Sequence, residues 1–143
     1  MNKKNLLAVV AGFATSFILG WLVYDVILKN FYQANSMAGL NKPEDQVIMW
    51  AIVMGALTGV LLMNYVLGLA GADTFMKGAT TGLIVSVLMA ASYDFYFYAA
   101  TNMISKSEVI CVDVLSSGVQ GAIIGGVIGM VRGMAGKPAA AAA

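Results

Sequence analysis

The chain has 143 residues, of which 60% are hydrophobic and 10% are charged, and its formal net charge is +1. A water-soluble fold of this size cannot bury so much apolar surface, because small domains leave a large share of their surface exposed. The low net charge provides no basic surface, so we expect no nucleic-acid partner. Histidine is absent and Cys111 is the one cysteine, which excludes an internal disulfide and a multi-cysteine metal site.

Four apolar segments are long enough to cross a bilayer, which takes about 20 helical residues. They occupy residues 6–28, 47–70, 75–100 and 109–131. The first is longer than the ~7–15 residue apolar core of a signal peptide, so we interpret it as a retained helix rather than a cleaved signal. We therefore predict an all-α membrane protein, a four-transmembrane-helix bundle, with a single domain over residues 1–136. Residues 137–143, which end in five alanines, are expected to be disordered or not native.

The connections and the two halves add detail to this prediction. The tight turn at residues 71–74 predicts that the second and third helices form an antiparallel hairpin. The Tyr24-Asp25 pair is matched by Tyr93-Asp94, and residues 67–71 are matched by residues 132–136. These weak similarities suggest two parallel repeats of two helices.

The basic residues predict the orientation of the helices. With four spans, both termini and the 71–74 turn share one side of the membrane. That side carries Lys3, Lys4, Lys77, Arg132 and Lys137, and the other side carries Lys29, Lys42 and Lys106. Because basic residues are enriched on the cytoplasmic side, we expect both termini in the cytoplasm of a bacterial cell, with the protein in the inner membrane.

Small residues recur at every fourth position of each predicted helix and so form a small-residue stripe on one face. Such stripes let two helix backbones approach closely inside a membrane, where the helix keeps its own hydrogen bonds. The expected packing or oligomer face comprises Ser117, Gly121, Gly125, Gly129, Gly133, Gly55, Gly59, Gly78 and Gly82. One interpretation is internal packing of a single bundle. The other reserves the long stripe of the last helix, which resembles a glycine zipper, for self-association.

Three carboxylates lie towards the outer ends of the predicted helices, and acids inside a membrane are costly enough to suggest a function. Asp94 has no basic residue within one turn, whereas Asp25 has Lys29 one turn later. If the stripes that end at Asp94 and begin at Asp113 face each other, the two carboxylates converge. The candidate cation or proton site therefore comprises Asp94, Asp113, Asp25, Tyr93 and Tyr24. A water-filled vestibule lined by solvated acids is the alternative, and the aromatic residues at this level are typical of an interfacial belt.

Residues 17–25 (FILGWLVYD), continued to Phe31, resemble a family of small bacterial four-span integral membrane proteins classed as a domain of unknown function. The first helix of that family carries a glycine, a tryptophan–tyrosine pair and a downstream aromatic residue. In this chain two residues separate Trp21 from Tyr24, and Asp25 stands where the family has a small residue. The resemblance implies a four-helix protein of the bacterial inner membrane, and it implies no activity, because none is assigned to that family.

Two functions remain open from the sequence. The first is a non-catalytic membrane protein that associates with itself or serves as an accessory subunit of a membrane complex through its glycine faces. The alternative is a small transporter or channel with an outward-facing acidic site. We see no nucleotide-binding loop, metal cluster or nucleophile–base pair in the sequence, so we expect no enzyme activity, no cofactor and no metal site. The expected partners are the lipid bilayer and a second copy or another membrane protein.

Overall fold

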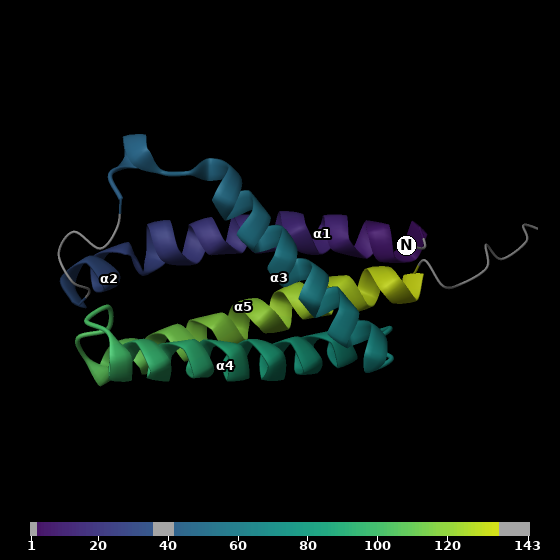
Figure 1. Ribbon diagram of the computed structural model, residues 1–143. Helices are drawn as coiled ribbons and strands as arrows, with labels where there is room; N and C mark the ends of the chain where they lie inside the picture. The colour runs from purple at the N-terminus through teal and green to yellow at the C-terminus, as the bar shows by residue number, and fades with distance from the viewer. Residues whose placement is uncertain (1–2, 36–41, 135–143) are drawn as a thin grey trace, which may run out of the picture.

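The computed structural model describes residues 3–35 and 42–134 (Figure 1). Most of these residues are helical and no strand occurs among them, which confirms the predicted all-α class. The elements are α1 (Lys3–Gly20), a π-helix η1 (Trp21–Ile27), α2 (Lys29–Asn35), a 3₁₀ turn η2 (Glu44–Gln46), α3 (Met49–Leu69), α4 (Phe75–Ala100) and α5 (Ser107–Met134). The predicted tail, residues 137–143, lies outside the described residues.

Four stretches are long and apolar enough to cross a membrane. They are Asn5–Ile27, Met49–Leu69, Phe75–Ala100 and Ser107–Met134. They coincide closely with the four predicted segments, so the four-helix bundle is confirmed and the chain has the architecture of a multi-pass membrane protein. The start of α1 and the end of α5 lie at the same end of the bundle, as an even number of crossings requires (Figure 1).

The short helix α2 is an element that the sequence interpretation did not include. It follows η1 at the opposite end of the bundle from the start of α1 (Figure 1). Lys106 Nζ, in the connection between α4 and α5, donates a hydrogen bond to Asn35 Oδ1 at 3.0 Å. This contact joins the end of α2 to the α4–α5 connection.

The closest helix pair is α4 with α5, which run side by side along their lengths (Figure 1). Glycines from both helices meet at their interface: a Cβ placed on Gly125 would lie 2.9 Å from Gly82 Cα, and one placed on Gly121 would lie 2.6 Å from the Gly82 carbonyl oxygen. Real Cβ atoms do not approach other atoms so closely. The small-residue stripes of these two helices therefore bring the backbones into direct contact, as expected for membrane helices.

The remaining helices pack more loosely. α1 lies against α5 and is crossed by α3, which runs obliquely over the bundle (Figure 1). Their shared core is apolar and centres on Ile128 of α5, which is fully buried. The other buried members of this core are Ala8, Val9, Val60, Met63, Leu67 and Ala72. The absence of a side chain at Gly12 of α1 leaves room for Ile128, because a Cβ at Gly12 would lie 2.7 Å from the Ile128 side chain.

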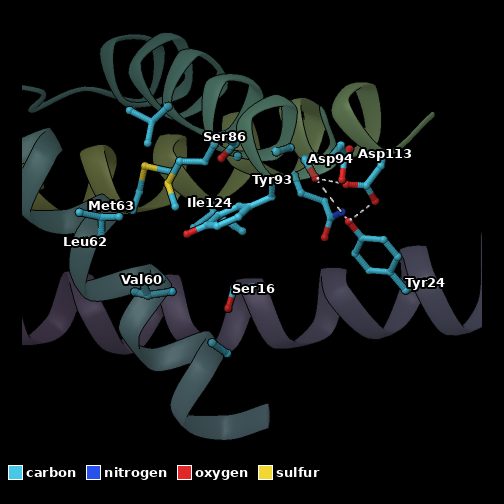
Figure 2. Close-up of a pocket in the computed structure, with 18 residues that line it drawn as sticks. Ser16, Tyr24, Val60, Leu62, Met63, Ser86, Tyr93, Asp94, Asp113 and Ile124 are labelled. Carbon is cyan, nitrogen blue, oxygen red and sulfur yellow. Dashed lines mark hydrogen bonds between the residues drawn. The ribbon is translucent and has the colours of Figure 1, made fainter. Parts of the chain in front are cut away.

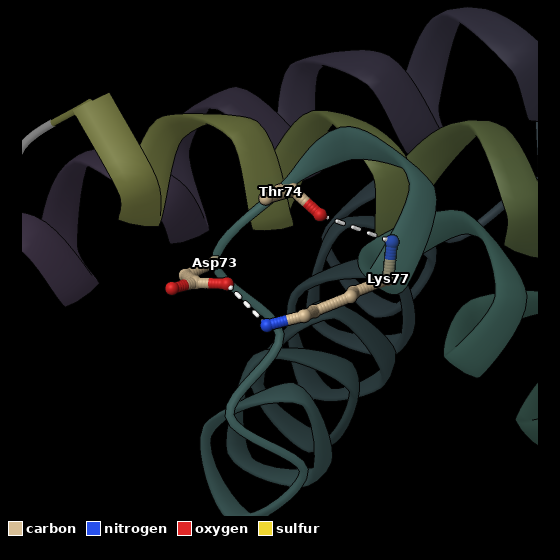
Figure 3. Close-up of polar contacts among 3 residues, drawn as sticks. All are labelled: Asp73, Thr74 and Lys77. Atoms are coloured by element: carbon tan, nitrogen blue, oxygen red, sulfur yellow. Dashed lines mark hydrogen bonds and ion pairs between the residues drawn. The ribbon is translucent and has the colours of Figure 1, made fainter.

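The connection between α3 and α4 is a short turn. Gly71 has a φ of 60°, a left-handed conformation that glycine adopts without steric cost. Thr74 caps α4, since its hydroxyl accepts a hydrogen bond from the Lys77 amide at 3.3 Å, and Lys77 Nζ pairs with Asp73 at 3.0 Å (Figure 3). The two helices diverge beyond this turn, and α4 packs mainly against α5 instead of forming a close hairpin with α3.

Candidate functional site

A cleft of about 450 Å³ lies inside the membrane-spanning part of the bundle. Its walls come from α1, η1, α3, α4 and α5. Figure 2 shows Asp94, Asp113 and Tyr24 grouped at one end of this cleft, with Leu62 and Met63 at the other. The cleft exists because α3 diverges from α4, so that the two helices do not fill the space between them. We call it the acidic cleft.

Asp94 is the most unusual residue of the acidic cleft. It continues the α4 stripe that contains Gly78 and Gly82, so the close approach of α5 covers it. The residue is 8% exposed, and its Oδ2 atom is buried without a hydrogen-bond partner among the described residues. Leaving a buried polar atom unsatisfied costs about 1–3 kcal/mol, and more when the atom carries charge. Asp94 therefore needs a further partner, such as a proton, a cation or water.

Asp113 of α5 also lines the acidic cleft but has its own donors. The hydroxyl of Tyr24 donates to Asp113 Oδ1 at 3.2 Å, and the hydroxyl of Tyr32 donates to the same atom at 2.5 Å. Ser117 Oγ lies 3.5 Å from Asp113 Oδ2. Burial and the neighbouring Asp113 raise the pKa of the Tyr32 phenol, so this hydroxyl stays protonated and available as a donor. Asp113 thus has several hydrogen-bond donors, whereas the Oδ2 atom of Asp94 has none among the described residues.

The π-helix η1 carries one of these donors. A π-turn takes an extra residue per turn and is often found at functional sites. It occupies Trp21–Ile27, and within it Tyr24 faces Asp113 while Asp25 is exposed. The rings of Tyr24 and Tyr32 lie 5.7 Å apart, which places both hydroxyls beside one carboxylate. The π-helix and α2 together therefore build the donor side of the acidic cleft.

Four of the five predicted site residues line the acidic cleft. Asp94, Asp113 and Tyr24 are grouped in it, and Tyr93 borders it with its side chain 58% exposed. Asp25 does not line it and is exposed. The stripes that end at Asp94 and begin at Asp113 face each other across the α4–α5 interface, and the two carboxyl groups share one cleft.

The predicted packing residues divide into two groups. Glycines of the first group contact other parts of the same chain, either across the α4–α5 interface or at the turn before α4. They are Gly78, Gly82, Gly121, Gly125, Gly129 and Gly133. In the second group are Gly55 and Gly59 of α3. An added Cβ at either position would meet no described atom of another helix within 4 Å, so these positions are open. Ser117 lines the acidic cleft instead of a helix contact, and it lies 3.4 Å from the Tyr24 hydroxyl.

Sequence reasoning missed Tyr32, the second donor to Asp113. No sequence signal marks this contact, because Tyr32 lies in the separate short helix α2 and its partner Asp113 is 81 positions away. Sequence reasoning also treated Arg132 only as a topology signal. In the structure Arg132 Nη1 donates to Asn64 Oδ1 at 3.0 Å and to Asn5 Oδ1 at 3.2 Å, which joins three helices.

The chemistry open to the acidic cleft is the binding of a positive charge. Its polar groups are two carboxyls, hydroxyls and the amide of the buried Gln120. Among the side chains that the structure describes, no cluster of three or more acidic, histidine or cysteine groups suited to a metal ion occurs. Comparison of the chain with family models, with curated protein sequences and with solved structures finds no match.

Proposed function

We propose that this chain is a small transport protein of the bacterial inner membrane that binds a proton or a small cation at Asp94. The observation that carries the proposal is the buried Oδ2 atom of Asp94, which has no hydrogen-bond partner among the described residues and belongs to a residue that lines the acidic cleft. An ionised carboxyl is stable in a low-dielectric interior only when a proton, a cation or several donors offset its charge.

The neighbouring Asp113 strengthens this argument. Its carboxylate already accepts hydrogen bonds from the hydroxyls of Tyr24 and Tyr32. A second negative charge on Asp94 in the same cleft would be repelled by the first. A bound proton or cation at Asp94 removes that repulsion and supplies the missing partner. Reversible binding of this kind is the elementary step of a carrier or a channel site.

The proposal includes an orientation in the membrane. The positive-inside rule supports cytoplasmic termini, with Lys3, Lys77 and Arg132 on the cytoplasmic side. Asp94 and Asp113 then lie in the outer half of the bundle, and the acidic cleft would exchange ions with the outer side. The resemblance of the first helix to a bacterial four-span family supports the inner membrane as the location.

The test is proton or cation flux in liposomes that contain the purified protein and a pH-sensitive dye. We expect Asp94→Asn to abolish the flux, because the amide cannot exchange a proton or neutralise a cation. Asp25→Asn is the matched control, since Asp25 is exposed and outside the acidic cleft, and it should retain the flux. Equal flux from the wild type and Asp94→Asn would contradict the proposal.

Self-association is a second candidate function, and α3 supports it. The open position beside Gly55, which does not line the acidic cleft, leaves room for another helix backbone to approach closely. Trp50, on the same helix, is 72% exposed. The occupant we propose is α3 of a second copy, because the glycines of α4 and α5 already contact each other.

The mass of the purified protein in detergent, with the detergent subtracted, tests this second candidate. A defined oligomer that becomes monomeric in Gly55→Leu would support it. Gly20→Leu is the control, because Gly20 also has open space around it but lies on another helix. A monomeric wild type at all concentrations would exclude self-association and leave an unlike membrane protein as the partner to seek.

A further inference from the structure

The end of the bundle opposite the acidic cleft carries a positive charge held by neutral groups. Arg132 lies in the last turn of α5 and is partly buried. Its Nη1 atom donates to Asn5 Oδ1 at 3.2 Å, to Asn64 Oδ1 at 3.0 Å and to the Asn64 carbonyl oxygen at 3.3 Å. All these acceptors are neutral. They hold the guanidinium in place without offsetting its charge.

Among the described residues, no carboxylate forms an ion pair with Arg132. Asp73 is the one acidic residue in the turn between α3 and α4, and it pairs with Lys77 at 3.0 Å (Figure 3). That pair is the one salt bridge among the side chains that the structure describes. The hydrogen bond from Lys77 lowers the pKa of Asp73, so this carboxyl stays ionised and engaged with Lys77. The guanidinium of Arg132 therefore keeps a charge that these neighbours do not balance.

A groove of about 420 Å³ lies beside this guanidinium. Asn5, Asn64 and Arg132 supply its polar side, and Leu61, Tyr65 and Leu69 supply its apolar side. Gly68 leaves room next to the guanidinium, because a Cβ there would lie 3.1 Å from Arg132 Nη2. A guanidinium has five N–H donors in a planar fork, and its hydrogen bonds to the described residues come from Nη1 alone.

We propose that this groove binds a phosphate group through Arg132, and that the phosphate belongs to an anionic phospholipid. The planar guanidinium fork matches two phosphate oxygens, and Asn5 and Asn64 hold it in position. The apolar wall favours a lipid over free phosphate, since Leu69 is 73% exposed and Tyr65 is 64% exposed. Basic pockets between membrane helices at the cytoplasmic surface commonly bind lipid head groups. This site is separate from the acidic cleft.

Native mass spectrometry of the full chain tests the proposal, with vesicle lipids of defined composition as probes. The wild type should retain bound phosphatidylglycerol in preference to phosphatidylcholine. Arg132→Gln should bind phosphatidylglycerol about tenfold more weakly, the effect of losing one charge-assisted phosphate contact. Lys77→Gln removes the same charge at the same end but outside the groove, and it should bind like the wild type. Equal binding of the two lipids, or equal binding by the wild type and Arg132→Gln, would overturn the proposal.

A second variant keeps the test decisive if Arg132→Gln does not fold. Gly68→Leu retains the charge and fills the groove beside Arg132 Nη2, so it should also weaken phosphatidylglycerol binding. The free-phosphate arm measures the melting temperature with inorganic phosphate added to the lipid-free protein. An increase in the wild type that Gly68→Leu lacks, without retention of phosphatidylglycerol, would overturn the lipid assignment and give the site to free phosphate. Binding of neither phosphate source would overturn the site altogether.

Discussion

Gly82 and Gly59 are both glycines in the small-residue stripes of membrane helices, but Gly82 is tightly packed and Gly59 borders open space. Gly82 of α4 is buried against the backbone of α5, so even one added carbon would collide with Gly121. Gly59 of α3 borders the acidic cleft, and an added Cβ there would meet no described atom of another helix within 4 Å. A stripe therefore shows that close approach is possible, but it does not show which helix makes it.

This difference also explains where the chemistry lies. The tight contact of α4 with α5 leaves no space, and it carries Asp94 into a buried position at the end of its stripe. The loose contact of α3 with α4 leaves the volume into which Asp94 and Asp113 face. The face of α4 that packs on α5 thus holds the two helices together. The space between α3 and α4 leaves room for a ligand beside Asp94.

The largest expected effect on stability comes from disrupting the close α4–α5 interface. Gly82→Leu should destabilise the bundle by about 3 kcal/mol, the upper end of the usual cost of overpacking, because the new side chain has to displace the backbone of α5. Gly59→Leu is the matched control on the loose side and should change the stability little. Unfolding in detergent, followed by circular dichroism, compares the two variants. Equal stability of Gly82→Leu and Gly59→Leu would contradict the comparison.

A smaller effect is expected at the donor side of the acidic cleft. Tyr32→Phe removes one hydrogen bond to Asp113 and should cost about 1–2 kcal/mol. The loss should disappear in a background that already carries Asp113→Ala, which has no side-chain acceptor, so a double-mutant cycle on thermal unfolding checks the pair. Tyr96→Phe, at an aromatic residue 63% exposed and outside the cleft, should be neutral. Additive effects of the first two substitutions would rule out the hydrogen bond as the cause.

The smallest effect is expected at the turn that joins the two sides. The pKa of Asp73 is lowered by Lys77, so the pair contributes its stability above the ordinary carboxyl pKa of about 4 and loses it as the pH falls below that value. Because both side chains are exposed, Lys77→Gln should barely change the melting temperature at neutral pH. A thermal melt at neutral and at acidic pH measures the difference, and a large shift at neutral pH would show that this pair is more than a surface contact.

The fold was predictable because its signals are local. Apolar runs of about 20 residues define the spans, and small residues at every fourth position define one face of each helix. The convergence of Asp94 with Asp113 followed from extending two such faces. The stripes on α3 and α4 look alike in the sequence, however, so the spacing favoured no particular pairing of the helices.

The parts that could not be predicted depend on contacts between distant residues. Tyr32 and Asp113 are separated by 81 positions, and no periodic pattern links them. The π-helix η1 changes the direction of Tyr24 without a glycine or proline inside it to mark the change. Arg132 meets Asn64 only because α3 crosses the bundle obliquely, which is a property of the packed structure and not of either helix alone.

The most direct test of the proposed charge change at Asp94 is an infrared measurement of the protein in lipid while pH and cation concentration are varied. The C=O band of a protonated carboxylic acid should appear in the wild type, vanish on titration or cation binding, and be missing from Asp94→Asn. It should remain in Asp25→Asn. A spectrum of Asp94→Asn identical to that of the wild type under all conditions would contradict the proposal that Asp94 binds the proton or the cation.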